Sequence, residues 1–244
     1  MIMESPTIAP DRTTEFEESF RTLRTNVLLR ATAGDKTFLI SSARPREGKS
    51  TIAAILSRFL AASGRDVLLI DADARRPRLH EIFHVVNGVG FMDLLQDSSA
   101  AFTGAVHKIG SQFHLLTSGK STRDPQQLFL GAALAQRLAE FTKAYDLVLI
   151  DSPPILAVAD AVLLAPKVDG VLLVFRAGEV TGSEVKLATE RLSTVSARVL
   201  GCVLNNASEL NGFGYHPYAQ EYLERMTERA VLPKAKLQGN GHDA

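Results

Sequence analysis

The sequence predicts an α/β protein with a doubly wound, mostly parallel sheet that carries helices on both faces. Short apolar runs alternate with longer amphipathic segments along most of the chain, which is the pattern of repeated βα units. The chain has 244 residues, a length that suits one α/β domain with short tails. Hydrophobic residues make up 45% of it, enough apolar surface for a single large core.

Six apolar runs have the length and composition of buried parallel strands. They are residues 37–40, 67–70, 113–116, 147–150, 171–175 and 199–204. Between them, residues 50–62, 125–144 and 182–195 repeat apolar side chains at helical spacing. A further helix is expected at 14–30, before the alternation begins, where it would pack on the outside of the domain or on a neighbour.

The expected domain organisation has three parts. Residues 1–14 form a flexible N-terminus, residues 15–206 form the folded domain, and residues 207–244 form a tail. After Asn206 the composition shifts to Gly, Asn, Tyr and Pro, and the last residues are polar, which is typical of a mobile end.

Charge and cysteine content exclude several classes of protein. Lys plus Arg (27) equals Asp plus Glu (27), so we expect no nucleic-acid partner held by general electrostatics. Cys202 is the one cysteine, so no intrachain disulfide can form, and its apolar surroundings predict a buried core thiol. The N-terminus lacks a basic, apolar leader, and no apolar run reaches the ~18 residues of a membrane span. We therefore expect a cytoplasmic protein that meets the membrane only through a partner.

A phosphate-binding loop is predicted between the strand that starts at residue 37 and the helix that starts at residue 50. The Gly48-Lys49-Ser50-Thr51 run of a Walker A loop follows the strand directly, preceded by Arg46 and Glu47. Backbone N–H groups and the helix dipole can hold phosphate oxygens, Lys49 can reach the β and γ phosphates, and Ser50 can ligate Mg²⁺. The strict pattern asks for glycine at position 43, where this chain has alanine.

Three carboxylates are expected to face this loop. Asp71 and Asp73 end one apolar strand and Asp151 ends another, at the sheet edge where open α/β folds bind ligands. A single acid in such a place is often only a helix cap or a turn residue. Together with the loop, the three favour a Mg²⁺ site, which uses one or two carboxylates and leaves one acid for another task.

In these motifs the chain resembles the cytoplasmic kinase domain of bacterial tyrosine kinases, a branch of the P-loop NTPases that regulates capsule and exopolysaccharide synthesis. The resemblance spans about residues 15–206, and the matching segments occur in the family's order. They are residues 18–26, 47–51, 67–77, 124–128 and 146–154.

The resemblance implies an ATP-dependent protein-tyrosine autokinase that phosphorylates tyrosines on a neighbouring subunit. It implies that Asp71 is the base that accepts the tyrosine proton, acting with Lys49, and that Ser50, Asp73 and Asp151 serve Mg²⁺. Asn205 ends the final strand, where related nucleotide-binding proteins often place an adenine contact. ATP and Mg²⁺ are therefore the expected cofactors.

Two further family features concern assembly. Glu18, Arg21 and Arg24 match an E-x-x-R-x-x-R oligomerisation motif and share a helix face, although a charged stripe is often merely solvated. The resemblance implies a ring-like homo-oligomer and a membrane-protein activator of the polysaccharide co-polymerase type, which would recruit the chain to the inner face of the membrane. The acceptor tyrosines would be Tyr215, Tyr218 and Tyr222, of which the last two could instead pack together on a helix starting at Pro217.

The chain departs from the family in two places, so two other functions stay open. Arg46 stands where the family usually has glycine, and the tail holds fewer tyrosines than the family's dense cluster. One alternative is an ATPase of the ParA/MinD type, although such proteins usually have a lysine at the position of Arg44. The other is a nucleotide-binding regulatory module with weak kinase activity. His80 and His84 have helical spacing but lack the HExxH arrangement of a zinc site.

Overall fold

The computed structural model describes residues 12–120 and 124–207, with side chains from residue 16 onward. Its centre is a sheet of seven strands in the order β3-β4-β2-β5-β1-β6-β7, parallel except for β3, which runs antiparallel to β4. The strands are β1 (Thr37–Ser42), β2 (Val67–Asp71), β3 (Val106–Lys108), β4 (Phe113–Leu116), β5 (Leu147–Asp151), β6 (Gly170–Arg176) and β7 (Val199–Asn205). The expected doubly wound α/β fold is confirmed.

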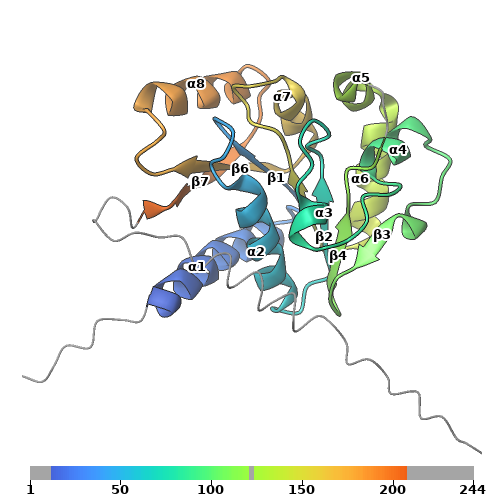
Figure 1. Ribbon diagram of the computed structural model, residues 1–244, viewed down its shortest axis with the longest axis horizontal. Coiled ribbons are helices and arrows are strands. Elements are labelled where there is room, and N and C mark those ends of the chain that lie inside the picture. The colour runs from blue at the N-terminus through green and yellow to red at the C-terminus, as the bar shows by residue number, and fades with distance from the viewer. Residues whose placement is uncertain (1–11, 121–123, 208–244) are drawn as a thin grey trace, which may run out of the picture.

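Helices cover both faces of this sheet (Figure 1). They are α1 (Arg12–Thr32), α2 (Lys49–Ala61), α3 (Leu79–Ile82), α4 (Phe91–Gln96), α5 (Pro125–Leu130), α6 (Ala132–Ala144), α7 (Asp160–Leu164) and α8 (Gly182–Ser193), with 3₁₀ turns η1 (Phe102–Gly104) and η2 (Ala165–Lys167). The apolar residues of α1, α2 and α3 form one core cluster with one face of the sheet. Those of α4 to α8 form a second cluster with the other face.

The two covered faces explain why the strands are continuous apolar runs instead of alternating ones. Every residue of β1, β2 and β5 is buried, because side chains on both faces of a central parallel strand meet helices. These three strands also end at the same edge, which fixes where the polar residues that follow them can meet.

Short elements account for most differences from the expected secondary structure. The single helix expected at 125–144 is two helices, because Gly131 adopts an extended conformation (φ −71°, ψ 156°) between α5 and α6. The strand β3 and the helices α3, α4 and α7 were not predicted, since elements of three to six residues are too short to show a clear period.

The strand β7 lies at the edge of the sheet, and this corrects the prediction for Cys202. We expected that thiol in the core, but Cys202 is exposed. Val199 and Leu204 of the same strand are also exposed, by 38% and 50%. The apolar run at 199–204 resembles a central strand in composition, but the edge position leaves much of β7 uncovered by helices.

The helix α1 packs on the outside of the domain against α2. Phe20 and Val27 are buried there, and the Phe20 ring stacks on the Phe59 ring of α2 with centroids 5.5 Å apart. In the described part of the chain, no helix is long and apolar enough to cross a membrane.

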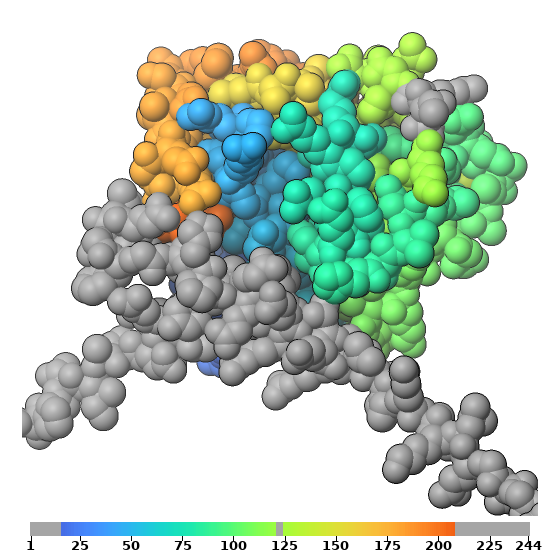
Figure 2. Space-filling model, viewed as in Figure 1, coloured from blue at the N-terminus to red at the C-terminus, as the bar shows by residue number. Residues whose placement is uncertain are grey.

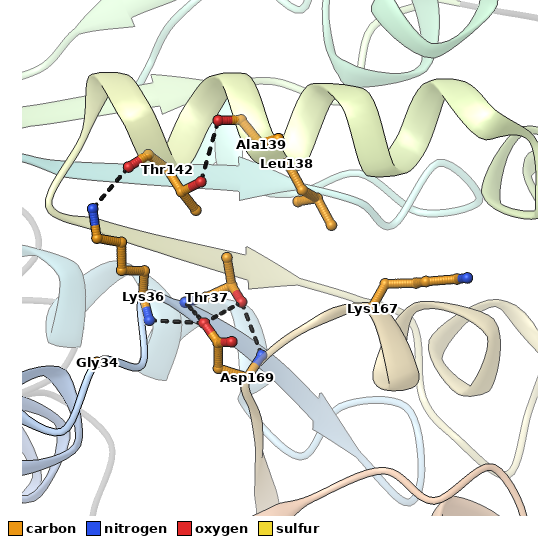
Figure 3. A pocket seen from close by; sticks show the side chains of 8 residues that line it. All are labelled: Gly34, Lys36, Thr37, Leu138, Ala139, Thr142, Lys167 and Asp169. Atoms are coloured by element: carbon orange, nitrogen blue, oxygen red, sulfur yellow. Dashed lines mark hydrogen bonds between the residues drawn. The ribbon is translucent and has the colours of Figure 1, made fainter.

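A shallow depression lies at the amino ends of β1 and β6, and Figure 3 shows the residues that line it. Hydrogen bonds in this depression join the start of β6 to the start of β1. Asp169 Oδ2 accepts bonds of 2.8 Å from the backbone N–H groups of Lys36 and Thr37 and from the Thr37 hydroxyl. These donors lower the pKa of Asp169 against the opposing effect of its burial. The depression is far from the loops described below, and its polar groups hold the starts of two neighbouring strands together.

The packing of α1 gives a stability prediction. Phe20→Ala removes a buried ring and leaves a cavity against Phe59, so we expect a loss of about 3–4 kcal/mol in the free energy of unfolding. Leu29→Ala on the same helix is the control, because Leu29 is 62% exposed and its loss should cost less than about 0.5 kcal/mol. Equal midpoints for the two variants in urea denaturation would contradict the packing of α1 on α2.

Candidate nucleotide and metal site

Three loops meet at the carboxyl edge of the sheet, because β2, β5 and β1 are neighbours. The strand register pairs Asp71 with Asp151 and Ile40 with Asp151, so the chain leaves all three strands at nearly the same level. Backbone bonds join the loops further: Ala72 N–H donates to Asp151 O at 2.8 Å. In Figure 2 the blue surface of the segment that follows β1 lies between the orange and teal surfaces of later segments.

The loop between β1 and α2 has the conformation expected of a phosphate-binding loop. Gly48 caps α2 with φ 92°, a left-handed conformation that favours glycine. No side chain among the described residues caps this helix, which leaves its first backbone N–H groups available for an anion. Lys49, Ser50 and Thr51 form the first turn.

Asn205, at the end of β7, fixes the loop from the side. Its Nδ2 donates to the Glu47 carbonyl at 3.0 Å, and a Cβ on Gly48 would collide with the same nitrogen. We predicted Asn205 as an adenine contact, and that remains untested, but in this structure its amide N–H holds the loop. The next residue, Asn206, is buried with φ 65°, and its Nδ2 has no partner within the described residues.

Glu47 faces the protein interior. Its Oε2 accepts the Arg44 backbone N–H at 2.7 Å, and the side chain is buried. Burial raises the pKa of Glu47, while backbone N–H groups of the loop oppose this effect. The side chain therefore shapes the loop from inside, so any nucleotide contact of Glu47 would come through its backbone.

Two positions where glycine was expected behave differently. Ala43 is fully buried in the core and is absent from the positions with positive φ, so a Cβ is tolerated there. Arg46 adopts φ 71°, the left-handed region in which a side chain is strained. Its side chain is exposed and makes no ion pair with another described residue. The usual glycine would fit the Arg46 conformation without that strain.

Lys49 lies between two of the three predicted carboxylates. Its Nζ is 2.9 Å from Asp73 Oδ2, 3.6 Å from Asp151 Oδ1 and 3.3 Å from Ser50 Oγ. Burial alone would lower the pKa of Lys49, but the charges of Asp151 and Asp73 outweigh it and raise this pKa. One ammonium thus links the loop to the ends of β2 and β5.

Asp71 is fully buried and is held by backbone donors. Asp71 Oδ1 accepts the Asp73 N–H at 3.1 Å, and Oδ2 accepts the N–H groups of Arg78 and Leu79 at 3.0 Å each. Burial and the nearby Asp151 charge raise the pKa of Asp71 to about 7, in spite of these donors.

The arrangement fits a magnesium ion held by few protein ligands. Asp151 is fully buried and its charge is compensated by Lys49, 3.6 Å from Oδ1, yet neither carboxylate oxygen has a hydrogen bond in the described structure, so both keep the capacity to ligate a cation. Burial raises the pKa of Asp151, and the Lys49 charge opposes the rise. No group of three His, Cys, Asp or Glu side chains in the described segments forms a metal cluster. A Mg²⁺ ion needs only one or two carboxylates besides phosphates and water, and Asp73 and Asp151 are the carboxylates beside Lys49.

The predicted assembly residues are placed only in part. On α1, Arg21 pairs with Glu17 at 3.2 Å and with Glu18 at 3.5 Å, and the Glu18 and Arg21 side chains are 65% and 53% exposed. Arg24 is half-buried, and its Nε has no partner within the described chain. Tyr215, Tyr218 and Tyr222 lie outside the described residues, as does the helix considered from Pro217 onward.

Sequence reasoning missed one group at the site. Asp160, at the start of α7, is fully buried and binds the guanidinium of Arg75. A lone aspartate after an apolar loop carries no signal of such a contact.

Comparison with known proteins identifies the chain. The model of the AAA domain family matches residues 36–198. The tyrosine-protein kinase YwqD of Bacillus subtilis is 35% identical over 211 residues, which cover 85% of this chain and 89% of YwqD. The chain belongs to the bacterial tyrosine-kinase family. The putative tyrosine-protein kinase CapB of Staphylococcus aureus is 31% identical over 84% of this chain and 90% of CapB.

Solved structures of the tyrosine-kinase family share the fold. The kinase domain of Escherichia coli ETK superposes with a TM-score of 0.73 at 32% identity, over 77% of this chain and 74% of that domain. The chimerical protein CapA2B2 gives 0.72 at 30% identity, over 82% and 86%. The chain spans nearly all of YwqD and CapB, but its match covers 26% of full-length Etk from E. coli K12.

The strain at Arg46 gives a prediction that the family's usual glycine can test. Arg46→Gly removes the left-handed penalty of about 1–2 kcal/mol and adds a glycine entropy cost of about 0.5–1 kcal/mol. We therefore expect the free energy of unfolding to rise by up to about 1.5 kcal/mol in urea denaturation without nucleotide. The control is Arg65→Gly at an exposed residue without positive φ, where glycine should only destabilise. A loss of stability at residue 46 as large as at residue 65 would show that Arg46 is not strained.

Proposed function

We propose that this chain is an ATP-dependent protein-tyrosine autokinase of the polysaccharide-regulating kind, which phosphorylates tail tyrosines of neighbouring subunits. The observation that carries the proposal is the position of Lys49, on a phosphate-binding loop and in contact with Asp73 and Asp151. This is an arrangement for one triphosphate and one divalent cation.

The chain's own residues have separate tasks in the proposed reaction. Loop N–H groups and Lys49 hold the phosphates, while Ser50, Asp73 and Asp151 hold Mg²⁺. When bound, the ion neutralises charge on the phosphate oxygens. The tyrosine Oη–P bond forms as the bond between the γ-phosphorus and its bridging oxygen breaks, and the phenol proton passes to Asp71. Positioning and charge neutralisation dominate such transfers, so a weak base suffices.

The environment of Asp71 both supports and limits its proposed role. A pKa of about 7 suits a general base at neutral pH better than that of an ordinary aspartate. However, Asp71 is fully buried and accepts N–H groups from Arg78 and Leu79. The 78–79 part of the loop must therefore move away before a tyrosine hydroxyl can reach the carboxylate.

Assembly follows from the same proposal. Glu18 and Arg21 lie on the exposed side of α1, where a neighbouring subunit can reach them, and Arg24 is close to them on the same helix. We propose a ring-like oligomer and a membrane-protein activator that recruits the chain to the inner face of the membrane. The CapA2B2 chimera and the Klebsiella pneumoniae relative described as a putative tyrosine-protein kinase in the cps region support a polysaccharide setting.

A switch ATPase of the MinD type is the second candidate. MinD of Pyrococcus horikoshii complexed with Mg-ADP superposes with a TM-score of 0.62 at 19% identity, which shows a shared fold only. Arg44, where such ATPases usually have a lysine, is turned toward α8: its Nε is 3.5 Å from Glu184, and its Nη1 donates to Glu179 O at 3.3 Å. The Arg44 side chain is 50% exposed, so what favours the kinase is the missing lysine at this position and not the contact with α8.

The kinase proposal predicts phosphate on the tail. Incubated with Mg-ATP, the wild-type protein should gain phosphotyrosine among Tyr215, Tyr218 and Tyr222, as mapped by mass spectrometry. Asp71→Asn should lower kcat about 10²–10⁴-fold and leave ATP binding near normal, since the proton acceptor is lost while Lys49 and the phosphate loop are kept. Lys49→Met should instead weaken ATP binding in calorimetry. Steady ATP hydrolysis without phosphotyrosine, with or without a candidate activator, would favour the switch ATPase.

Assembly is tested separately. We expect the triple variant Glu18→Ala, Arg21→Ala and Arg24→Ala to fall from oligomer to monomer in light scattering, because a charged contact would be lost from every interface. Glu190→Ala is a suitable control, since this residue is exposed and its side chain forms an ion pair with Lys186 on the same helix α8. An unchanged mass for the triple variant would refute the α1 contact.

A further inference from the structure

An ion pair joins the loop after β2 to the start of α7. Arg75 Nε donates to Asp160 Oδ2 at 2.8 Å, and Arg75 Nη2 donates to Asp160 Oδ1 at 3.1 Å. The Asp160 side chain is 0% exposed, whereas that of Arg75 is 40% exposed. The guanidinium therefore covers a buried carboxylate in the two-point geometry that only arginine provides.

The same carboxylate also contacts the beginning of α5. Gln126 Nε2 donates to Asp160 Oδ1 at 3.2 Å, and Asp124 Oδ1 is 3.7 Å from Arg75 Nη2. The helices α5 and α7 contact each other and lie side by side in Figure 1. Asp160 is thus held in place by α7, which packs in the second core cluster, and by Gln126 of α5. Arg75 attaches the loop after β2 to this buried carboxylate.

Arg75 occupies the middle of the turn that orients Asp73. Arg76 N–H donates to Asp73 Oδ1 at 3.0 Å and to Asp73 O at 3.2 Å, which closes the turn around Arg75. This leaves Asp73 Oδ2 free to contact Lys49 at 2.9 Å. Holding the side chain of Arg75 therefore limits the direction in which the Asp73 carboxylate can point.

We propose that Arg75 and Asp160 are positioning residues that hold the turn at 73–76 so that Asp73 faces Lys49 and the metal-bound triphosphate. Neither residue touches a reacting atom. The kinetic part of this inference rests on the proposed kinase function, whereas the structural part concerns the free protein. A positioning error of about 1 Å can cost on the order of 10²-fold in rate, so a loosened turn has a measurable effect.

Arg75→Lys is the sharpest change, because it keeps the positive charge over Asp160 but removes the two-point contact. Its matched control is Arg78→Lys on the same loop. Arg78 forms an ion pair of 3.0 Å with Glu81, and both side chains are exposed, by 64% and 54%. Arg78 contacts Asp71 through its backbone N–H, which a lysine at this position keeps. Asp160→Asn tests the same contact from the other side, and thermal unfolding confirms that each variant is folded at the assay temperature.

The first measurement is amide hydrogen exchange in the nucleotide-free protein, resolved to single residues. In Arg75→Lys the Arg76 amide should exchange at least about tenfold faster, because its bond to Asp73 opens locally. The Leu79 amide, bound to Asp71 beyond the turn, should change much less. Arg78→Lys should leave the Arg76 amide unchanged. An unchanged Arg76 amide in Arg75→Lys, or equal acceleration at residues 76 and 79, would overturn the proposal.

The second measurement is the dependence of the kinase rate on Mg²⁺ and ATP. In Arg75→Lys and in Asp160→Asn, kcat should fall about tenfold and half-saturation by Mg²⁺ should need a severalfold higher concentration, with KM for ATP within about twofold. The double variant should be no worse than either single one, since the two residues act as a unit. The proposal would be overturned if the losses in kcat of the two single variants added fully in the double variant, or if the variants changed only KM for ATP. If the wild type shows no kinase activity, the proposed function fails, and the exchange experiment alone decides the role of Arg75.

Discussion

The ammonium group of Lys49 is the interaction on which the rest of the site depends. It is the cation that contacts both Asp73 and Asp151, and Asp151 is completely removed from water. A buried carboxylate without a compensating charge is strongly unfavourable, so the ends of β2 and β5 can carry these acids only because the loop after β1 brings a lysine to them. With three acids and one ammonium together, the charges do not balance. This imbalance, added to burial, explains why the pKa of Asp71 rises to about 7.

The parts of this site that could be predicted are those that follow from the order of residues within a short stretch of the sequence. A strand followed by a Gly-Lys-Ser turn and a helix fixes the phosphate loop, and acids directly after apolar strands must reach the same sheet edge. The contacts that hold these parts come from far along the chain and leave no local pattern. Asn205 reaches Glu47 across 158 positions, and Asp160 reaches Arg75 across 85. The apolar run at Cys202 misled for a related reason, since composition does not reveal which strand forms the sheet edge.

The unusual residues of the loop are also explained by tertiary structure. Ala43 is acceptable because its backbone does not need glycine and its methyl group is in the core. Arg46 is different, because its backbone is left-handed and its side chain has no partner in the described chain. Glu47 and Asn205 together hold the loop around it, with bonds of 2.7 and 3.0 Å. Strain at a single residue persists when the surrounding contacts determine the backbone so firmly.

In the proposed reaction the loop after β2 has two tasks, and these conflict unless its two parts move separately. Its first part must hold Asp73 in place, whereas its second part covers Asp71 with the N–H groups of Arg78 and Leu79. If the loop moved as one body, exposing Asp71 would also turn Asp73 away from Lys49. Arg75 lies between the two parts and is attached to the core through Asp160. In the proposed reaction, an anchor at that position would allow residues 78–79 to open while the turn at 73–76 stays fixed, so the proposed base would become accessible without loss of the proposed metal ligand.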